Sequence, residues 1–377
     1  MSRAPVDVPN PSTEERDDDE EMPRVVITRR GALLFGVFVA AALAFLYLVL
    51  PKLTGLSGDW KQIREGDPWW LGIALALQVI SFLGYVWLFR AVFVRGEWSR
   101  IDWRASYEIT MAGLAATRLF AAAGAGGVVL TAWALRRSGM ERRIVACRMV
   151  AFLVLVYGVY MASLVVVGIG LRVGLLPGGG SFAITIVPAS FAAVLMVLFL
   201  GMSALPEDAE RRLQRWASGS GRAARFLAKA VTIPASAASG VRTAIHLVRA
   251  RETGVLGAVV WWYFNILTLW ACFHAFGPDP PPFAIIVMAY FVGMLGNLLP
   301  LPGGIGGVDG GMIGAFAAFD VSVGYATLAV LSYRAFAFWL PTVPGAIAYF
   351  QLRRTVSRWR EDRDTERALA RAATARA

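Results

Sequence analysis

Blocks of about 20 consecutive apolar residues recur along this chain, and they constrain its fold more than any other feature. A helix of that length spans the ~30 Å hydrocarbon core of a bilayer. Only 17% of the 377 residues are charged, whereas a soluble domain carries roughly 25%. We therefore predict an all-α integral membrane protein with six transmembrane helices. They are expected at 31–51, 68–91, 144–171, 181–204, 255–277 and 323–350.

Two further apolar stretches, 105–135 and 283–317, are interrupted by glycines and are predicted not to cross the membrane. Arginines flank the first stretch on both sides, and the positive-inside rule puts both flanks in the cytoplasm. Its 31 residues are too few for two crossings. We expect it to form a re-entrant helical hairpin that turns at 124–127. The second stretch is expected to form an opposed hairpin, which enters from the external side and turns at 300–307.

The basic residues are distributed unevenly between the two sides of this topology. With the N-terminus in the cytoplasm, the cytoplasmic segments hold 29 Arg and Lys, and the external loops hold four. This asymmetry predicts that both termini are cytoplasmic. It also explains the net charge of +11 without a nucleic-acid partner. The cytoplasmic segments include a disordered tail at 1–30, a basic linker at 205–254 and a basic tail at 356–377.

The two halves of the chain resemble each other. Two motifs, G-x-G-G-V and R-x-x-A-F, occur twice in the same order, at 124–128 and 148–152 and again at 304–308 and 334–338. Each copy consists of a span, a hairpin and a span, over 68–171 and 255–350, and the two copies run in opposite directions. Such inverted repeats recur in transporters, with the substrate near the midplane. The alternative is that both segments are ordinary kinked helices whose glycines allow close packing.

Charged side chains inside apolar blocks mark candidate sites, because each costs roughly 2.5–3.5 kcal/mol on insertion scales. Arg334 lies near the middle of its predicted span, and Asp309 follows the second glycine turn. One expectation is a structural ion pair between the two. The other is that Arg334 binds a lipid phosphate, which suits a guanidinium group, while Asp309 holds Arg334 in place. Arg118 in the first hairpin is a further candidate. Arg148 is another, although its position near a span end also suits snorkelling to the surface.

The glycine turns form the second part of the candidate substrate site. Backbone N–H groups at the start of half-helices attract phosphate, which adds Gly124, Gly126, Gly127, Gly304, Gly306 and Gly307 to the candidates. Asn297 is expected to bond backbone groups at the second break. No Walker lysine follows either turn, and the sequence shows no catalytic triad, carboxylate pair or His/Cys cluster. We therefore expect neither an enzyme nor a bound metal or cofactor.

The second glycine turn also carries a family resemblance. The run P-L-P-G-G-I-G-G-V-D at 300–309, with Y-R at 333–334 and W-x-P at 339–341, resembles the signature of the lysylphosphatidylglycerol synthase transmembrane, or flippase-like, family of bacteria. The likeness covers about 31–355. The family commonly has Glu where this chain has Asp309. The first turn lacks the proline and acidic residue of many relatives, so the first site is expected to bind differently or to be structural.

The resemblance implies a flippase-like domain that moves a phospholipid or polyprenyl-linked glycolipid across the bacterial inner membrane. Synthase activity is not implied, because only about 25 residues follow the last predicted span. The implied partners are anionic membrane lipids and, as for some relatives, a cytoplasmic glycosyltransferase. Two alternatives stay open. One is a transporter of ions or small solutes, and the other is a scaffold that docks a glycosyltransferase through 206–254.

Overall fold

The computed structural model describes residues 66–94, 101–119, 125–203, 238–298 and 304–374, and every regular element within them is helical. Five helices are long and apolar enough to cross a membrane: Pro68–Phe93, Arg142–Arg172, Phe182–Gly201, Thr253–Phe276 and Val323–Glu366. They confirm the predicted all-α, multi-pass membrane architecture. The first four match predicted spans closely, because an unbroken apolar block of this length has few other ways to satisfy its backbone in a bilayer. The predicted span at 31–51 lies outside the described residues.

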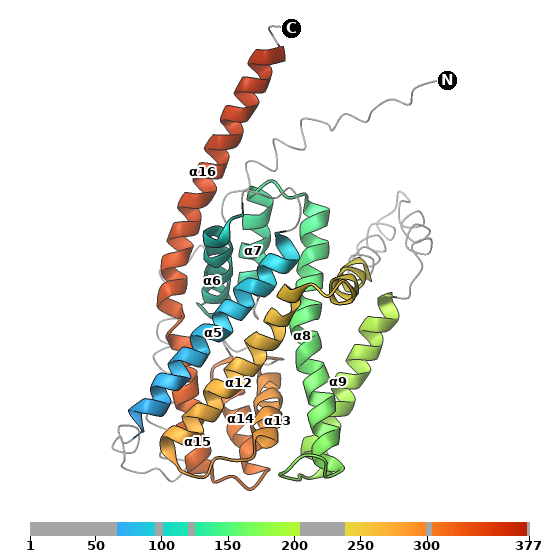
Figure 1. Cartoon of the computed structure of the whole chain (residues 1–377), viewed down its shortest axis with the longest axis vertical. Helices are drawn as coiled ribbons and strands as arrows, with labels where there is room; N and C mark the ends of the chain where they lie inside the picture. The colour runs from blue at the N-terminus through green and yellow to red at the C-terminus, as the bar shows by residue number, and fades with distance from the viewer. Residues whose placement is uncertain (1–65, 95–100, 120–124, 204–237, 299–303, 375–377) are drawn as a thin grey trace, which may run out of the picture.

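The centre of the bundle is a pair of antiparallel helices, α5 (Pro68–Phe93) and α12 (Leu256–Phe276). They lie side by side along much of their length (Figure 1). Gly84 and Gly257 let the two backbones approach, since a Cβ on Gly257 would collide with the carbonyl oxygen of Gly84. Small residues at such a contact are the usual means of close helix packing in membranes.

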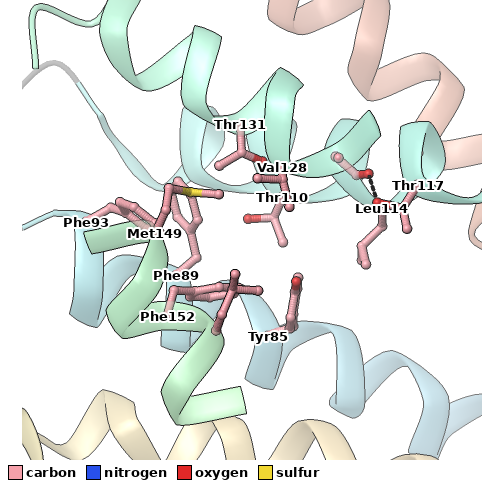
Figure 2. A pocket seen from close by; sticks show the side chains of 13 residues that line it. Tyr85, Phe89, Phe93, Thr110, Leu114, Thr117, Val128, Thr131, Met149 and Phe152 are labelled. Carbon is pink, nitrogen blue, oxygen red and sulfur yellow. Dashed lines mark hydrogen bonds between the residues drawn. The ribbon is translucent and has the colours of Figure 1, made fainter. Parts of the chain in front are cut away.

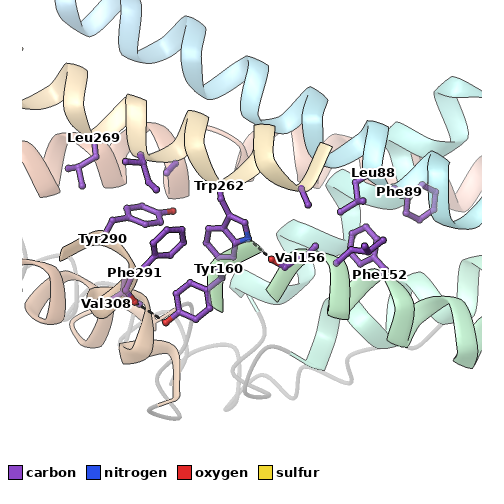
Figure 3. Packing of buried hydrophobic residues seen from close by; sticks show 14 of the residues in the cluster. Leu88, Phe89, Phe152, Val156, Tyr160, Trp262, Leu269, Tyr290, Phe291 and Val308 are labelled. Atoms are coloured by element: carbon purple, nitrogen blue, oxygen red, sulfur yellow. Dashed lines mark hydrogen bonds between the residues drawn. The ribbon is translucent and has the colours of Figure 1, made fainter. Parts of the chain in front are cut away.

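An aromatic core joins this pair to the neighbouring helices α8 (Arg142–Arg172) and α13 (Phe283–Met294). Trp262 of α12 donates a hydrogen bond of 2.7 Å to the carbonyl oxygen of Val156. Tyr160 of α8 donates one of 2.8 Å to the carbonyl oxygen of Phe291. Figure 3 shows these rings packed together between the helices. The polar tips of Trp262 and Tyr160 are therefore satisfied by backbone groups. Helix α9 (Phe182–Ser203) packs on the outside of α8.

Each of the two glycine-broken segments is a pair of short helices packed against each other. The first pair is α6 (Trp103–Leu119) and α7 (Ala125–Arg137). The second pair is α13, which continues as a 3-10 turn over Leu295–Leu298, and α14 (Gly307–Ala317). In Figure 1 the first pair occupies the upper half of the body and the second pair the lower half. The turns at 120–124 and 299–303 lie outside the described residues.

The last predicted span, 323–350, differs from the expected simple helix. Helix α15 (Val323–Arg334) runs into a π-helix at Ala335–Trp339. Helix α16 (Thr342–Thr374) then continues far beyond residue 350 and includes most of the predicted tail at 356–377. The first part of α16 packs along α6, where Gly345 lies against Met111 and Ala115.

Part of the predicted linker 205–254 is also helical. Residues 238–249 form a helix, and the preceding part of the linker lies outside the described residues. Gly240 brings this helix against α8, since a Cβ there would be 2.5 Å from Val150 and 3.0 Å from the carbonyl oxygen of Cys147. The linker therefore contributes a packed element at the end of the body where α8 begins.

Candidate functional site

Arg334 and Asp309 form a buried ion pair, a contact that both sequence interpretations include. Nε of Arg334 lies 2.6 Å from Oδ1 of Asp309, but outside hydrogen-bonding geometry, so this contact is mainly electrostatic. The other carboxylate oxygen, Oδ2, accepts a hydrogen bond of 2.8 Å from the N–H of Gly306. Arg334 is 7% exposed and Asp309 is fully buried. The last residue of α15 is thus held against the first turn of α14.

Arg118 reaches the same region from the opposite helix pair. It lies one residue before the end of α6, and its Nη2 donates a hydrogen bond of 2.8 Å to the carbonyl oxygen of Ala337. Its Nη1 lies 3.4 Å from the carbonyl oxygen of Phe338. Both carbonyls belong to the π-helix, a type of element frequent at functional sites. Among the described residues Arg118 contacts no carboxylate, so backbone dipoles and aromatic rings are its partners.

The ring of Phe338 brings the two arginines together. Cζ of Arg334 lies 4.8 Å from the ring centroid, and Cζ of Arg118 lies 5.6 Å from it. Cations are attracted to aromatic faces at these distances. Among the described residues, Asp309 supplies the carboxylate of this cluster. Arg118, Arg334 and Asp309 together therefore carry two positive charges and one negative charge. One additional anionic group would neutralise it.

A hydrogen-bonded network of uncharged side chains lies beside this cluster. The hydroxyl of Tyr333 donates to Oδ1 of Asn265 at 3.2 Å, and it lies 3.0 Å from the hydroxyl of Tyr290. Asn265 in turn donates to Ser81 at 2.6 Å, and Gln78 donates to Asn265 at 3.4 Å. The network ties α5, α12, α13 and α15 together next to Arg334. Sequence reasoning missed it because its members are single polar residues in four separate apolar blocks.

Two glycines in the described part of the second glycine turn have a left-handed backbone conformation. Gly304 has φ 66° and Gly306 has φ 83°, which L-residues rarely adopt. Gly307 is the first residue of α14, so it lies at the start of a helix as predicted, although the predicted turn ends before it. Its carbonyl oxygen packs against Gly296, where no Cβ would fit. The first N–H groups of α14 have no intrahelical partners, as at every helix start, and the positive end of its dipole lies beside Asp309 and Arg334.

The first glycine turn differs more from the prediction. Gly124 lies outside the described residues, whereas Gly126 and Gly127 belong to the first turn of α7. A Cβ on Gly127 would collide with Oγ1 of Thr117 and the carbonyl oxygen of Gly113. This glycine is therefore needed for close contact between α6 and α7, and not for a positive φ. The alternative interpretation, glycine for helix packing, is correct at Gly127.

Two predicted site residues lie apart from the arginine cluster. Nη1 of Arg148 donates a hydrogen bond of 2.6 Å to the carbonyl oxygen of Phe93, the last residue of α5. Asn297 is exposed and donates to the sulfur of Met294 at 3.4 Å, and not to the backbone of the break. Their sequence positions near glycine turns and span ends did not determine where their side chains point.

A second polar contact joins α6 to α16. Glu108 is fully buried, and its carboxylate accepts hydrogen bonds of 2.9 Å from Nε of Arg104 and 2.6 Å from Oγ1 of Thr355. No sequence signal identified this contact, because Thr355 lies 247 residues from Glu108. The Glu108 contact fixes the N-terminal part of α6 against α16. At the C-terminal end of α6, Arg118 fixes the helix against the π-helix.

Comparisons with known proteins agree with this architecture. The sequence profile of a family described as the lysylphosphatidylglycerol synthase TM region matches residues 33–345, which include Arg118, Asp309 and Arg334. The chain is similar to a UPF0104 membrane protein of Methanothermobacter thermautotrophicus, with 25% identity over 339 residues, 85% of this chain and 96% of that protein. Two further UPF0104 membrane proteins of this organism match at 34% identity over 110 residues and 35% over 86 residues. These cover 29% and 23% of this chain, and 31% and 26% of those proteins.

Proposed function

Because this chain belongs to the family of the lysylphosphatidylglycerol synthase TM region, we propose that it binds a membrane lipid by its phosphate and moves it between the leaflets. The observation that carries this proposal is the cluster of Arg118 and Arg334 around Phe338, with Asp309 as its carboxylate. The substrate class is a phospholipid or a polyprenyl-linked glycolipid, since both present a phosphate. We propose no chemical step on that lipid, and so no enzymatic activity.

Phosphate suits this cluster better than a neutral headgroup or a cation does. An unneutralised positive charge inside an apolar body is costly, and a phosphate that approached Arg118 would remove this cost. Guanidinium groups bind phosphate with paired, directional hydrogen bonds. The start of α14 adds N–H groups and the positive end of a helix dipole beside Arg334. A cation would meet repulsion from both arginines.

The opposed positions of the two helix pairs support transport through this cluster. We infer that α6–α7 and α13–α14 are re-entrant hairpins of an inverted repeat, which enter from opposite faces (Figure 1). In both pairs the two helices pack closely through a contact between glycines. Gly127 meets Gly113 in one pair, and Gly307 meets Gly296 in the other. A site between two such hairpins is reached from either leaflet when one hairpin shifts.

The orientation of the chain is part of the proposal. We place the termini in the cytoplasm of a cell whose inner membrane holds the protein. In Figure 1, α7 ends and α8 begins at the upper end of the body. That end carries Arg104, Arg136, Arg137, Arg142 and Arg143. At the opposite end, Arg172 at the end of α8 is the basic residue among the described helix ends and loops. This charge distribution supports a cytoplasmic upper end.

The test uses the purified full chain in liposomes that contain a trace of headgroup-labelled phosphatidylglycerol. A membrane-impermeant quencher reports how fast the label crosses the bilayer. We expect the wild-type protein to accelerate crossing, and Arg118→Gln to lose most of this acceleration. Arg143→Gln is the matched control, because Arg143 is exposed at the start of α8. Equal rates for the two variants would refute a phosphate role for Arg118. Binding of the labelled lipid without crossing would instead favour a scaffold.

A further inference from the structure

An apolar cavity lies between the first helix pair and the helices α5 and α8. It is lined by residues of all four helices, among them Tyr85, Leu114, Val128, Thr131, Met149 and Phe152. Figure 2 shows these side chains around an open space. The empty space of the cavity and its open mouth together is about 450 Å³.

The lining excludes charged ligands from this cavity. It contains no charged side chain and no amide. Two of its hydroxyl groups already donate hydrogen bonds within the protein. Thr110 and Thr117 donate to carbonyl oxygens of their own helix at 2.6 Å and 3.0 Å. The hydroxyls of Tyr85 and Thr131 have no hydrogen-bond partner within the described part of the chain. The cavity therefore suits a hydrocarbon segment that carries at most a few hydrogen-bond acceptors.

The cavity begins next to the arginine cluster on two helices. Thr117 lines it on α6, and the next residue is Arg118. Tyr85 lines it on α5, and Phe82, one helical turn earlier, lies with its ring centroid 5.8 Å from Cζ of Arg118. A ligand with an anionic group at Arg118 would therefore extend directly into this apolar space.

The cavity also opens toward the surroundings of the helix bundle. Val128 belongs to its lining and is nevertheless 40% exposed. The helices around it include two of the membrane-spanning segments, α5 and α8. The medium outside such segments is lipid hydrocarbon.

We propose that this cavity binds one hydrocarbon chain of the lipid whose phosphate lies at Arg118. The inference rests on the proposed function and adds a second subsite to it. The chain enters past Val128 from the leaflet next to α7, and the hydroxyls of Tyr85 and Thr131 donate to oxygen atoms at the head end of the chain. The chain is thereby held inside the protein while the headgroup reaches the arginines.

The test uses phosphatidylglycerol with a photoactivatable diazirine in one acyl chain and the full-length protein in nanodiscs. After illumination, mass spectrometry identifies the labelled peptides. We expect label on Leu114 and Phe152, and we expect an excess of unlabelled phosphatidylglycerol to suppress it. Lipid that merely surrounds the bundle also labels the protein, but competitor does not saturate that background.

Two neighbouring residues of α7 provide a matched pair of variants. Val128→Trp places an indole in the cavity mouth and should reduce the saturable label at Leu114 at least fivefold. Val129→Trp makes the same change at a residue that is 51% exposed and outside the lining, and should leave the label unchanged. Thr131→Phe fills the cavity from inside and should act like Val128→Trp. Thermal stability of each variant is measured in parallel. If either Val128→Trp or Thr131→Phe fails to fold, the other is still compared with the Val129→Trp control.

The outcomes separate this inference from the proposed function. If Arg118→Gln abolishes lipid crossing while no saturable label appears in the cavity, the chain subsite is wrong and the phosphate site stands. If the cavity is labelled equally in Arg118→Gln, and a neutral diacylglycerol competes as well as phosphatidylglycerol, the chain subsite stands and the phosphate site fails. Equal labelling of the two tryptophan variants and the wild type would overturn the cavity assignment.

Discussion

Nη2 of Arg118 lies 2.8 Å from the carbonyl oxygen of Ala337, which joins two residues 219 positions apart in the sequence. This contact connects the inner end of the first helix pair with the π-helix of the last span. Asp309, at the start of α14, reaches the same point through Arg334. The end of α6, the π-helix and the start of α14 therefore meet at one place, and each interrupts regular α-helix. In a bilayer, interrupted helices are tolerated where protein or a cavity surrounds them.

The ion pair of Arg334 and Asp309 yields the first prediction. Arg334→Leu leaves a fully buried carboxylate with the N–H of Gly306 as its hydrogen-bond donor. We expect a loss of about 3–5 kcal/mol of stability, measured as thermal unfolding in detergent. The double variant Arg334→Leu with Asp309→Leu should recover most of that stability, because the two charges are removed together.

Lipid crossing by the same variants separates structure from binding. If Arg334 also contacts the phosphate, the stable double variant should still fail to move labelled phosphatidylglycerol. Full recovery of transport in the double variant would show that the pair is purely structural.

The backbone at Gly306 yields the second prediction. Its φ of 83° and ψ of −43° are accessible to glycine and strained for L-residues. Gly306→Ala should therefore cost about 1–3 kcal/mol and should displace the Asp309 carboxylate from its N–H partner. Gly310→Ala is the control on the same helix, because a Cβ there meets no atom within 4 Å. Equal thermal stability of the two variants would contradict the strain assigned to Gly306.

Gly127 yields the third prediction, which differs from the one its sequence position suggested. Gly127→Ala should separate α6 from α7, lower thermal stability and impair transport through misplacement of Arg118. Adding Thr117→Ala should restore only part of the stability, because the carbonyl oxygen of Gly113 still obstructs the new Cβ. Gly158→Ala is the control, since no atom lies within 4 Å of a Cβ there. Full rescue by Thr117→Ala would mean that the backbone contact is unimportant.

The membrane orientation yields the fourth prediction. In a variant in which Cys147 and Cys272 are replaced by alanine, single cysteines are introduced at Asp279 and at Glu141, which are both exposed. A membrane-impermeant maleimide added to intact cells should label position 279 and not position 141. Labelling of both positions would place the outer end of the first helix pair outside the cell and would contradict its re-entrant topology.

Spans were predictable from the sequence where an apolar block is long and uninterrupted, as in α5, α8, α9 and α12. The extension of α16 was not, because its polar residues beyond position 350 are typical of a solvated tail. The part of α16 up to Thr355 is held against α6 by helix packing and by the hydrogen bond from Thr355 to Glu108, and the helix continues beyond this contact.

The candidate site was predictable in part for a similar reason. A charge in an apolar block needs a partner, so Arg334 and Asp309 stood out and do pair. The partners of Arg118 are backbone carbonyls of a π-helix, and no pattern in the sequence indicates that element. Glycine occurs both in turns and at close contacts between helices. Only the structure shows that Gly306 belongs to a turn and that Gly127 belongs to a close contact.

The π-helix at Ala335–Trp339 also sets the rotational phase of everything that follows it. A π-turn accommodates one residue more than an α-turn, and one residue of α-helix corresponds to a rotation of about 100°. Removing one residue here would turn α16 by about that angle relative to α15. Thr355 would then face away from Glu108, although it lies some four turns downstream. One extra residue beside the arginine cluster therefore determines which side of α16 meets α6.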